Sequence, residues 1–252
     1  HAGVTLGEDG ATHQTMEDIA LMRVLPDMVV INPCDWTPTK NATLAAATYD
    51  GPVYLRFGRP KVADFMPDEP FEIGKAYGLN EGKDVSIFAT GHMVWEALQA
   101  AEALEAEGIC AEIIDIATIK PLDTKAVLAS AIKTGAVVVA EEHNMAGGLG
   151  ELIAGVLAAT SPKPIEYVNG KDEFGQSGTP SELLAATAWT PPTSSRPPKR
   201  FWKGNNGILY KKQKKVRRRL CFLTFFLFYM PILRTGHSRR EGCCGSEGPE
   251  YS

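Results

Sequence analysis

The sequence predicts an α/β fold built on a mostly parallel sheet. Short apolar runs rich in Val and Ile alternate along residues 1–190 with longer stretches of helical periodicity, several of them rich in alanine. Some of these helical stretches end at a glycine, as helices often do. Because strand–helix alternation at this spacing builds βαβ units, we expect parallel strands with helices on both faces of the sheet.

The first part of the chain contains two expected helices and two expected strands. A capping-box pattern of Thr15 with Asp18 marks the start of the first helix. Either Asp35 or Thr37 is suited to cap the second helix, which closes at Asp50-Gly51. The expected elements are a helix over residues 15–25, a strand over 28–32, a helix over 40–48 and a strand over 52–57.

A linker is expected over residues 60–70, which contain three prolines, several acidic residues and little periodicity. This boundary divides the chain into domains over residues 1–68 and 69–190, followed by a tail over 191–252. The second domain is expected to contain strands over 85–89, 111–116, 136–140 and 165–168, and helices over 92–107, 123–133 and 151–159.

The charge of the chain changes sharply between the body and the tail. Residues 1–190 contain 12 Lys and Arg against 27 Asp and Glu, whereas residues 191–252 contain 14 against 3. The acidic body has no basic face with interleaved aromatic residues, which argues against nucleic-acid binding. Cys34 and Cys110 lie in apolar or mixed surroundings without metal-ligand spacing, so we expect buried thiols in a reducing, cytoplasmic compartment.

The tail is expected to be disordered or non-native, as the product of a frameshift, an assembly error or vector read-through. Its basic run over residues 211–219 precedes a 14-residue apolar stretch over 220–233 that includes Pro231. That stretch is shorter than the ~20 residues needed to cross a bilayer. A membrane-surface element, which a basic run beside an apolar segment would suit, is the alternative.

The stretch from His1 to Gln14 is the part of the sequence most suited to ligand binding. It has glycines at positions 3, 7 and 10, two histidines and Asp9, and a predicted helix follows it at once. Glycines let backbone approach a ligand closely, and helix N-termini favour negative charge. A ligand with phosphate and hydroxyl groups would suit this loop, although a plain strand-to-helix connection is the alternative.

Several motifs resemble those of transketolases. HAGVTLGEDGATHQ, continued by EDIALMRVLPDMVVINPCD, resembles the pyrimidine-binding domain of that family. IDIATIKPLD, VVVAEEHNMAGGLGELI and FGQSGTPSELL resemble consecutive pieces of the family's C-terminal domain. The resemblance covers residues 1–184 in order and implies a partial pyrimidine-binding domain followed by a C-terminal-type α/β domain, as in transketolases split into two chains. Deoxyxylulose-phosphate synthases and the β subunits of 2-oxo-acid dehydrogenases share parts of the pattern and remain alternatives.

The resemblance implies roles for individual residues. His13 corresponds to the family histidine near the cofactor's aminopyrimidine and the substrate carbonyl, where it would hydrogen-bond and transfer protons. Asp9 corresponds to the aspartate that holds a hydroxyl of the donor sugar. His1 corresponds to the histidine at the substrate phosphate, and Arg59 to the arginine that grips that phosphate. Arg56 is a weaker candidate for binding the same substrate phosphate.

The implied activity is transfer of a two-carbon ketol group between a ketose phosphate and an aldose phosphate. The implied cofactors are thiamine diphosphate and Mg²⁺, both held mainly by regions outside this chain, which contains no expected metal ligands. An N-terminal transketolase subunit or domain is the implied partner, in a homodimer or heterotetramer. Because the chain opens at His1 inside a motif, we expect an N-terminal truncation and no turnover by the chain alone. A non-catalytic remnant acting only in assembly is the alternative.

Other polar residues of the second domain are expected to be structural. His143-Asn144, followed by a glycine-rich segment, predicts a tight turn into a helix. The pair Glu141-Glu142 is expected to form a solvated strand end, and His92 to have no catalytic role.

Overall fold

A computed structural model of the chain describes residues 1–189 and Val216. The expectations for residues 191–252, including the membrane-surface element, therefore lie outside the described residues apart from Val216. In the described part, no helix is both long enough and apolar enough to cross a membrane.

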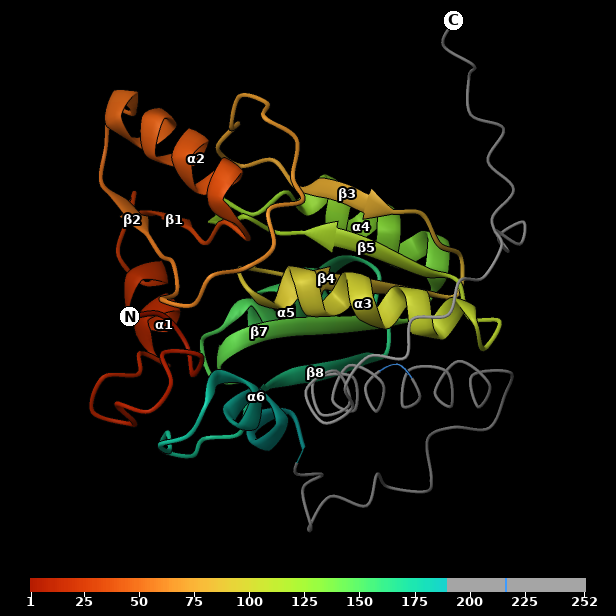
Figure 1. Cartoon of the computed structure of the whole chain (residues 1–252). Coiled ribbons are helices and arrows are strands. Elements are labelled where there is room, and N and C mark those ends of the chain that lie inside the picture. The colour runs from red at the N-terminus through yellow and green to blue at the C-terminus, as the bar shows by residue number, and fades with distance from the viewer. Residues whose placement is uncertain (190–215, 217–252) are drawn as a thin grey trace, which may run out of the picture.

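The larger of two sheets has five strands in the order β3-β5-β4-β7-β8 (Figure 1). β3 runs antiparallel to β5, and the other neighbours are parallel, which confirms the mostly parallel sheet. β3 was not predicted, because its sequence, Tyr-Gly-Leu-Asn, has little strand propensity. The strands are β3 (Tyr77–Asn80), β4 (Val85–Ala89), β5 (Ala111–Asp115), β7 (Val137–Asn144) and β8 (Ile165–Gly170).

Helices cover both faces of this sheet, as expected. α3 (Met93–Glu105) packs on one face, and α4 (Thr124–Thr134) and α5 (Leu149–Thr160) lie on the other (Figure 1). Side chains alternate along β4: Ile87 belongs to the core under α3, whereas Phe88 belongs to the core under α4 and α5. All five residues of β4 are buried, so apolar side chains lie on both faces of the strand instead of alternating with exposed polar ones.

The smaller sheet has the order β2-β1-β6 and joins distant parts of the chain. β1 (Val29–Ile31) and β2 (Val53–Leu55) are parallel, and β6 (Thr118–Lys120) adds antiparallel to β1. β6 follows β5 in sequence, so it connects the second part of the chain to the first. It was not predicted because it has only three residues. The remaining elements are α1 (Asp18–Arg23), α2 (Trp36–Thr48) and α6 (Pro180–Trp189), of which α6 was also not predicted.

The caps at the start of α2 and at the end of α4 agree with the sequence, although α2 begins at Trp36, before the predicted residue 40. Asp35 caps α2 by accepting a 3.0 Å bond from the Thr37 amide, and Gly135 ends α4 in the left-handed conformation. The capping box predicted for Thr15 and Asp18 was wrong. The helix begins at Asp18, and Glu17 at the N-cap makes no side-chain cap. The Asp18 carboxylate instead forms an ion pair with Arg56, a partner that the local sequence pattern cannot indicate.

The carboxyl end of β5 contains an ionisable group in the core. Asp115 is fully buried, beside the buried Cys34 thiol and near Asp35. Burial raises the pKa of the Asp115 carboxyl to about 7, against a smaller lowering contribution from the Cys34 thiol. The neutral form is therefore the one that the fold stabilises.

Replacing Asp115 with asparagine should change the pH dependence of stability. The folded-state pKa lies above the unfolded one, so the wild type loses stability as pH rises from the unfolded value through about 7. Asparagine does not titrate, so the stability of Asp115→Asn relative to wild type should rise by about 3 kcal/mol between pH 5 and pH 8. Urea unfolding at both pH values measures this. Asp68→Asn, at an exposed site, serves as control. If the stability relative to wild type is equally independent of pH for both variants, the assignment is contradicted.

Candidate functional site

The glycine-containing N-terminal loop, residues 1–17, lies against the carboxyl end of β7, which neighbours β4 in the sheet. The Thr5 amide donates to Oε1 of Glu142 at 3.0 Å, and the Asn144 amide donates to the Met16 carbonyl at 2.9 Å. The connections from β4 and β7 leave toward opposite faces of the sheet, so this is its topological switch point. Open α/β sheets commonly bind ligands there. Here the chain's own loop occupies that position (Figure 1).

Glycine is required in the loop at turns and close approaches. Gly3, Gly7 and Gly10 have φ values of 72°, 100° and 76°. Gly10 and His13 close successive turns, with amide bonds of 3.2 Å to the Gly7 carbonyl and 3.0 Å to the Gly10 carbonyl. All three glycines therefore have the positive φ that glycine adopts readily and other residues rarely do.

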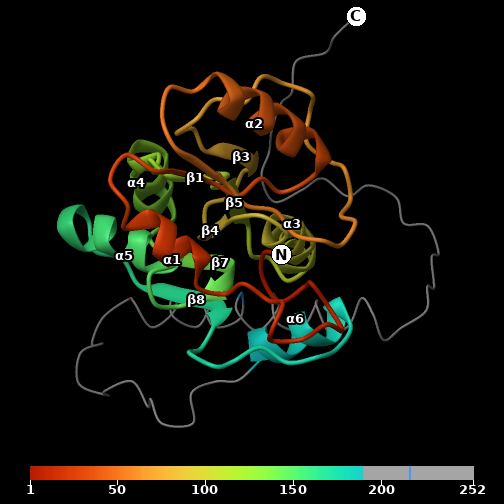
Figure 2. The ribbon, with the colours of Figure 1, turned by 90° about the vertical axis from the view of Figure 1, so that its left-hand side faces the viewer.

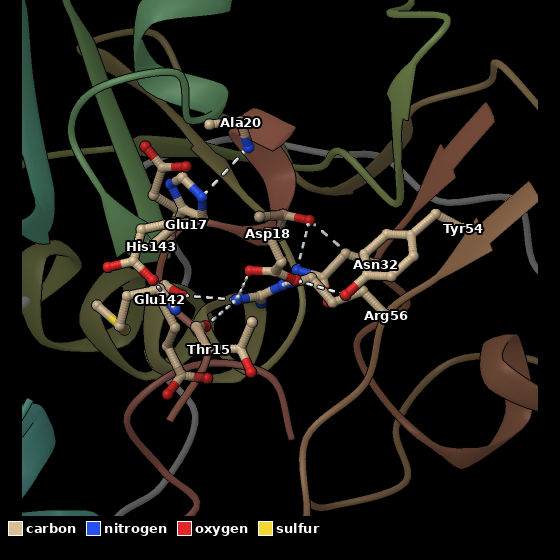
Figure 3. A network of polar contacts seen from close by, with 12 residues as sticks. Thr15, Glu17, Asp18, Ala20, Asn32, Tyr54, Arg56, Glu142 and His143 are labelled. Carbon is tan, nitrogen blue, oxygen red and sulfur yellow. Dashed lines mark hydrogen bonds and ion pairs between the residues drawn. The ribbon is translucent and has the colours of Figure 1, made fainter. Parts of the chain in front are cut away.

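Arg56 is the centre of a buried polar network beside the loop (Figure 3). Its Nε donates to Oδ2 of Asp18 at 2.7 Å, and Tyr54 donates to the same oxygen at 2.9 Å. Its Nη2 donates to the carbonyls of Thr15 at 3.2 Å and Glu142 at 2.9 Å. Arg56 therefore serves the fold. It also lines the cavity beside the loop, and the weaker expectation that it binds a substrate phosphate stays a prediction.

The charge of Asp18 depends on this network. Burial alone would raise the pKa of the Asp18 carboxyl. The Arg56 charge and the hydrogen bonds from Arg56 and Tyr54 outweigh burial, so this pKa lies below its ordinary value. The ion pair is thus intact at neutral pH.

The expectation of a solvated Glu141-Glu142 pair was wrong, because both residues are buried. The Glu141 carboxylate accepts from the amides of Leu149 at 2.6 Å and Gly150 at 3.0 Å. It thereby satisfies the first turn of α5, whose N-cap is a glycine without a side chain. Burial raises the pKa of Glu141 to about 7, although these hydrogen bonds oppose that change.

His143 has the structural role that the sequence suggested. It is fully buried, its Nδ1 lies 2.6 Å from the Asn144 carbonyl, and its Nε2 accepts from the Ala20 amide at 3.3 Å. Nδ1 can reach that carbonyl only as a donor, so it carries the proton. Because Nε2 accepts a hydrogen bond, it carries none, and the ring is neutral. Burial also lowers the pKa of His143.

The structure brings two of the four predicted site residues together. Arg59 Nη1 lies 2.6 Å from Oδ2 of Asp9 in an ion pair whose side chains are 56% and 46% exposed. His13 is exposed, with Nδ1 2.9 Å from Oγ1 of Thr12. His1 is exposed too, and within the described residues neither histidine has an ion pair or hydrogen bond to Asp9 or Arg59.

A segment near the C-terminal end of the described chain covers the other side of the loop. Gln14 Nε2 donates to the Gln176 carbonyl at 2.9 Å. Gly10 lies so close to Ser177 that a Cβ on it would be 2.3 Å from Oγ. Figure 2 shows α6 beside the N-terminal loop. Sequence reasoning missed this contact, although the small residues of the FGQSGTP motif were a signal for close packing.

A cavity of about 730 Å³ lies beside the loop, and its lining includes Thr5, His92 and Glu142. Burial would lower the pKa of His92, but Glu96 and Glu142 outweigh it and hold that pKa above its ordinary value. Asp9, His13 and Arg59 do not line this cavity. Among the described residues, no group of three or more His, Cys, Asp or Glu side chains could hold a metal ion.

The two parts of the chain match two family models. "Transketolase, pyrimidine binding domain" matches residues 1–64, and "Transketolase, C-terminal domain" matches residues 74–193. The chain belongs to the transketolase family. This confirms the resemblance of the HAGVTLGEDGATHQ and FGQSGTPSELL motifs and the α/β fold that it implied.

Relatives of this transketolase-family chain include a C-terminal section and a subunit of other transketolases. It is 46% identical over 188 residues to a protein named as a transketolase C-terminal section from Methanocaldococcus jannaschii, covering 73% of this chain and 58% of that protein. It is 46% identical over 177 residues to a 6-deoxy-6-sulfo-D-fructose transketolase subunit from a Clostridium species, covering 70% and 55%.

A solved split-gene transketolase, described as an inactive β4 tetramer, superposes with a TM-score of 0.71 at 42% identity. The match covers 87% of this chain and 65% of that one. The chain therefore spans little more than half the length of the curated relatives that it matches.

Removing the buried cation of this transketolase-family chain should destabilise the fold strongly. Arg56→Met leaves the Asp18 carboxylate buried without its charge partner, which typically costs ~3–5 kcal/mol. The matched control, Arg59→Met, removes the exposed ion pair with Asp9 and should cost less than ~1 kcal/mol. Urea unfolding of the two variants measures the difference, and equal losses would contradict the central role of Arg56.

Proposed function

We propose that the chain is part of a transketolase that transfers a two-carbon ketol group from a ketose phosphate to an aldose phosphate. The supporting observation is the glycine-containing loop, which presents Asp9 and His13 to solvent within one turn-rich segment and pairs Asp9 with Arg59. A carboxylate can accept a hydrogen bond from a sugar hydroxyl, and an imidazole can transfer a proton. A guanidinium can bind a phosphate.

Each proposed role follows from the chemistry of the side chain. Asp9 accepts a hydrogen bond from a hydroxyl of the donor sugar. Arg59 binds the sugar phosphate, together with His1 at the same end. Because the Asp9–Arg59 ion pair is exposed, it contributes little stability, and an incoming phosphate can compete with the carboxylate for the guanidinium.

His13 is proposed to contact both the cofactor and the substrate. The imidazole is exposed, and its Nδ1 is engaged by Thr12, so Nε2 is available to a ligand. An exposed imidazole on this loop fits the role of hydrogen-bonding an aminopyrimidine. It would also hold or transfer a proton near the substrate carbonyl.

The remaining parts of the site are proposed to come from other regions. Thiamine diphosphate, when bound, supplies the chemistry that breaks and forms the carbon–carbon bond. The diphosphate and Mg²⁺ would be held by an N-terminal transketolase subunit or domain, in a cytoplasmic homodimer or heterotetramer. The similarity to split-gene transketolase subunits supports such a partner.

A sulfonated sugar is a second candidate substrate. The observation that favours it is the 46% identity to a 6-deoxy-6-sulfo-D-fructose transketolase subunit. A guanidinium such as Arg59 binds a sulfonate with the same fork of donors as a phosphate. Parallel assays with phosphorylated and sulfonated ketoses separate the two.

The proposal predicts distinct kinetic effects for His13 and Asp9. In a complex of this chain with an N-terminal transketolase subunit, thiamine diphosphate and Mg²⁺, His13→Ala should lower kcat by ~10²–10⁴-fold through loss of proton transfer. Asp9→Ala should mainly raise KM for the donor sugar. Lys133→Ala, which removes an ion pair with Glu112 away from the loop, is the control and should leave both constants unchanged.

Steady-state ketol transfer, measured with a panel of sugar phosphates and with 2-oxo acids, tests these effects. Wild-type turnover of 2-oxo acids but not sugar phosphates would reject the proposal in favour of a 2-oxo-acid dehydrogenase relative. Wild-type kinetics retained in the His13→Ala and Asp9→Ala variants would reject the assigned site.

A further inference from the structure

Glu142 connects the C-terminal domain to the loop that carries Asp9 and His13. It lies in β7, 137 residues from Thr5, and is 7% exposed. Its Oε1 accepts a 3.0 Å hydrogen bond from the Thr5 amide. One side chain outside the loop therefore holds the backbone near the start of the loop.

Gly3 brings the loop backbone directly onto this side chain. A Cβ on Gly3 would lie 2.7 Å from Cβ of Glu142 and 2.8 Å from its Cδ and Oε1. Gly3 also has a φ of 72°, which other residues rarely adopt. The close approach and the hydrogen bond to Thr5 thus form one contact, with no space between the loop and Glu142.

The backbone of Glu142 also reaches the far end of the loop, through Arg56. Nη2 of Arg56 donates to the Glu142 carbonyl at 2.9 Å and to the Thr15 carbonyl at 3.2 Å (Figure 3). The loop is thus anchored at Thr5 by the Glu142 side chain and at Thr15 through the Glu142 main chain. Asp9 and His13 lie between these two anchors.

We infer that Glu142 is a positioning residue, whose carboxylate sets the conformation of the loop that presents Asp9 and His13 to ligand. This inference rests on the proposed function of the loop. Between the anchors, short turns closed by the amides of Gly7, Gly10 and His13 order the backbone. Glycines in such turns allow many conformations, so an external anchor is needed to select one.

Amide hydrogen exchange of the full chain, followed by NMR, tests the anchor directly. In Glu142→Ala the Thr5 amide loses its acceptor, and its exchange should accelerate at least tenfold, whereas the amide of Ile113 in the inner strand β5 should change less than twofold. Glu142→Gln keeps an oxygen acceptor of the same shape and should remain close to wild type. The control Glu112→Ala removes bonds to Ser130 and Lys133 and should not affect Thr5.

Ligand binding gives a second readout. A titration with ribose 5-phosphate, followed by the amide shifts of Asp9 and His13, should show at least fivefold weaker binding in Glu142→Ala and near-wild-type binding in Glu142→Gln. Gly3→Ala disturbs the same contact from the loop side and should reproduce both effects of Glu142→Ala.

The outcomes separate the two proposals. Unchanged Thr5 exchange in Glu142→Ala, or equal acceleration at Thr5 and Ile113, would overturn the positioning role whatever the ligand does. Faster Thr5 exchange with unchanged sugar-phosphate affinity would overturn it as well. If the wild-type chain and its complex bind no sugar phosphate, the proposed function fails, and the exchange data still decide whether Glu142 anchors the loop.

Discussion

The buried guanidinium of Arg56 constrains the region in which the two domains meet. It extends from the end of β2 and contacts the loop at Thr15, α1 at Asp18 and the end of β7 at Glu142. Burying a cation is costly unless its charge is paired and its donors are satisfied. All three neighbouring elements must therefore be in place together, which couples the path of the N-terminal loop to the C-terminal domain.

The end of β7 distributes successive side chains among three elements. Glu141 supports the first turn of α5, Glu142 holds the loop at Thr5, and His143 accepts from the backbone of α1. In a strand, neighbouring side chains point to opposite faces. Glu141 and His143 thus serve elements on one face of the sheet, whereas Glu142 reaches the loop and the cavity on the other. Substituting each of these three residues should therefore disturb a different element.

This arrangement gives the C-terminal domain a part in the proposed site without supplying a group that touches substrate. The carboxyl edge of its sheet, where related architectures bind ligands, is occupied by the loop from the first domain. The loop is also covered by the segment around Gln176 and Ser177. A loop held from two sides offers Asp9 and His13 on a defined backbone, and such preorganisation lowers the entropy lost on binding.

The sequence alone determined the alternation of the main strands and helices, the mostly parallel sheet, the Gly135 helix end and the family, because these depend on local sequence pattern and on continuous motifs. It left open whether Asp35 or Thr37 caps α2, and it missed β3, β6 and α6. Local pattern could not show that Asp18 pairs with Arg56, that Glu141 and Glu142 are buried, or that β6 joins β1. Each of those contacts joins residues distant in sequence, and only the tertiary structure brought them within hydrogen-bonding distance. The same holds for the site. Sequence motifs indicated Asp9, His13 and Arg59, whereas the packing of β7 against the loop showed which residue holds Asp9 and His13 in place.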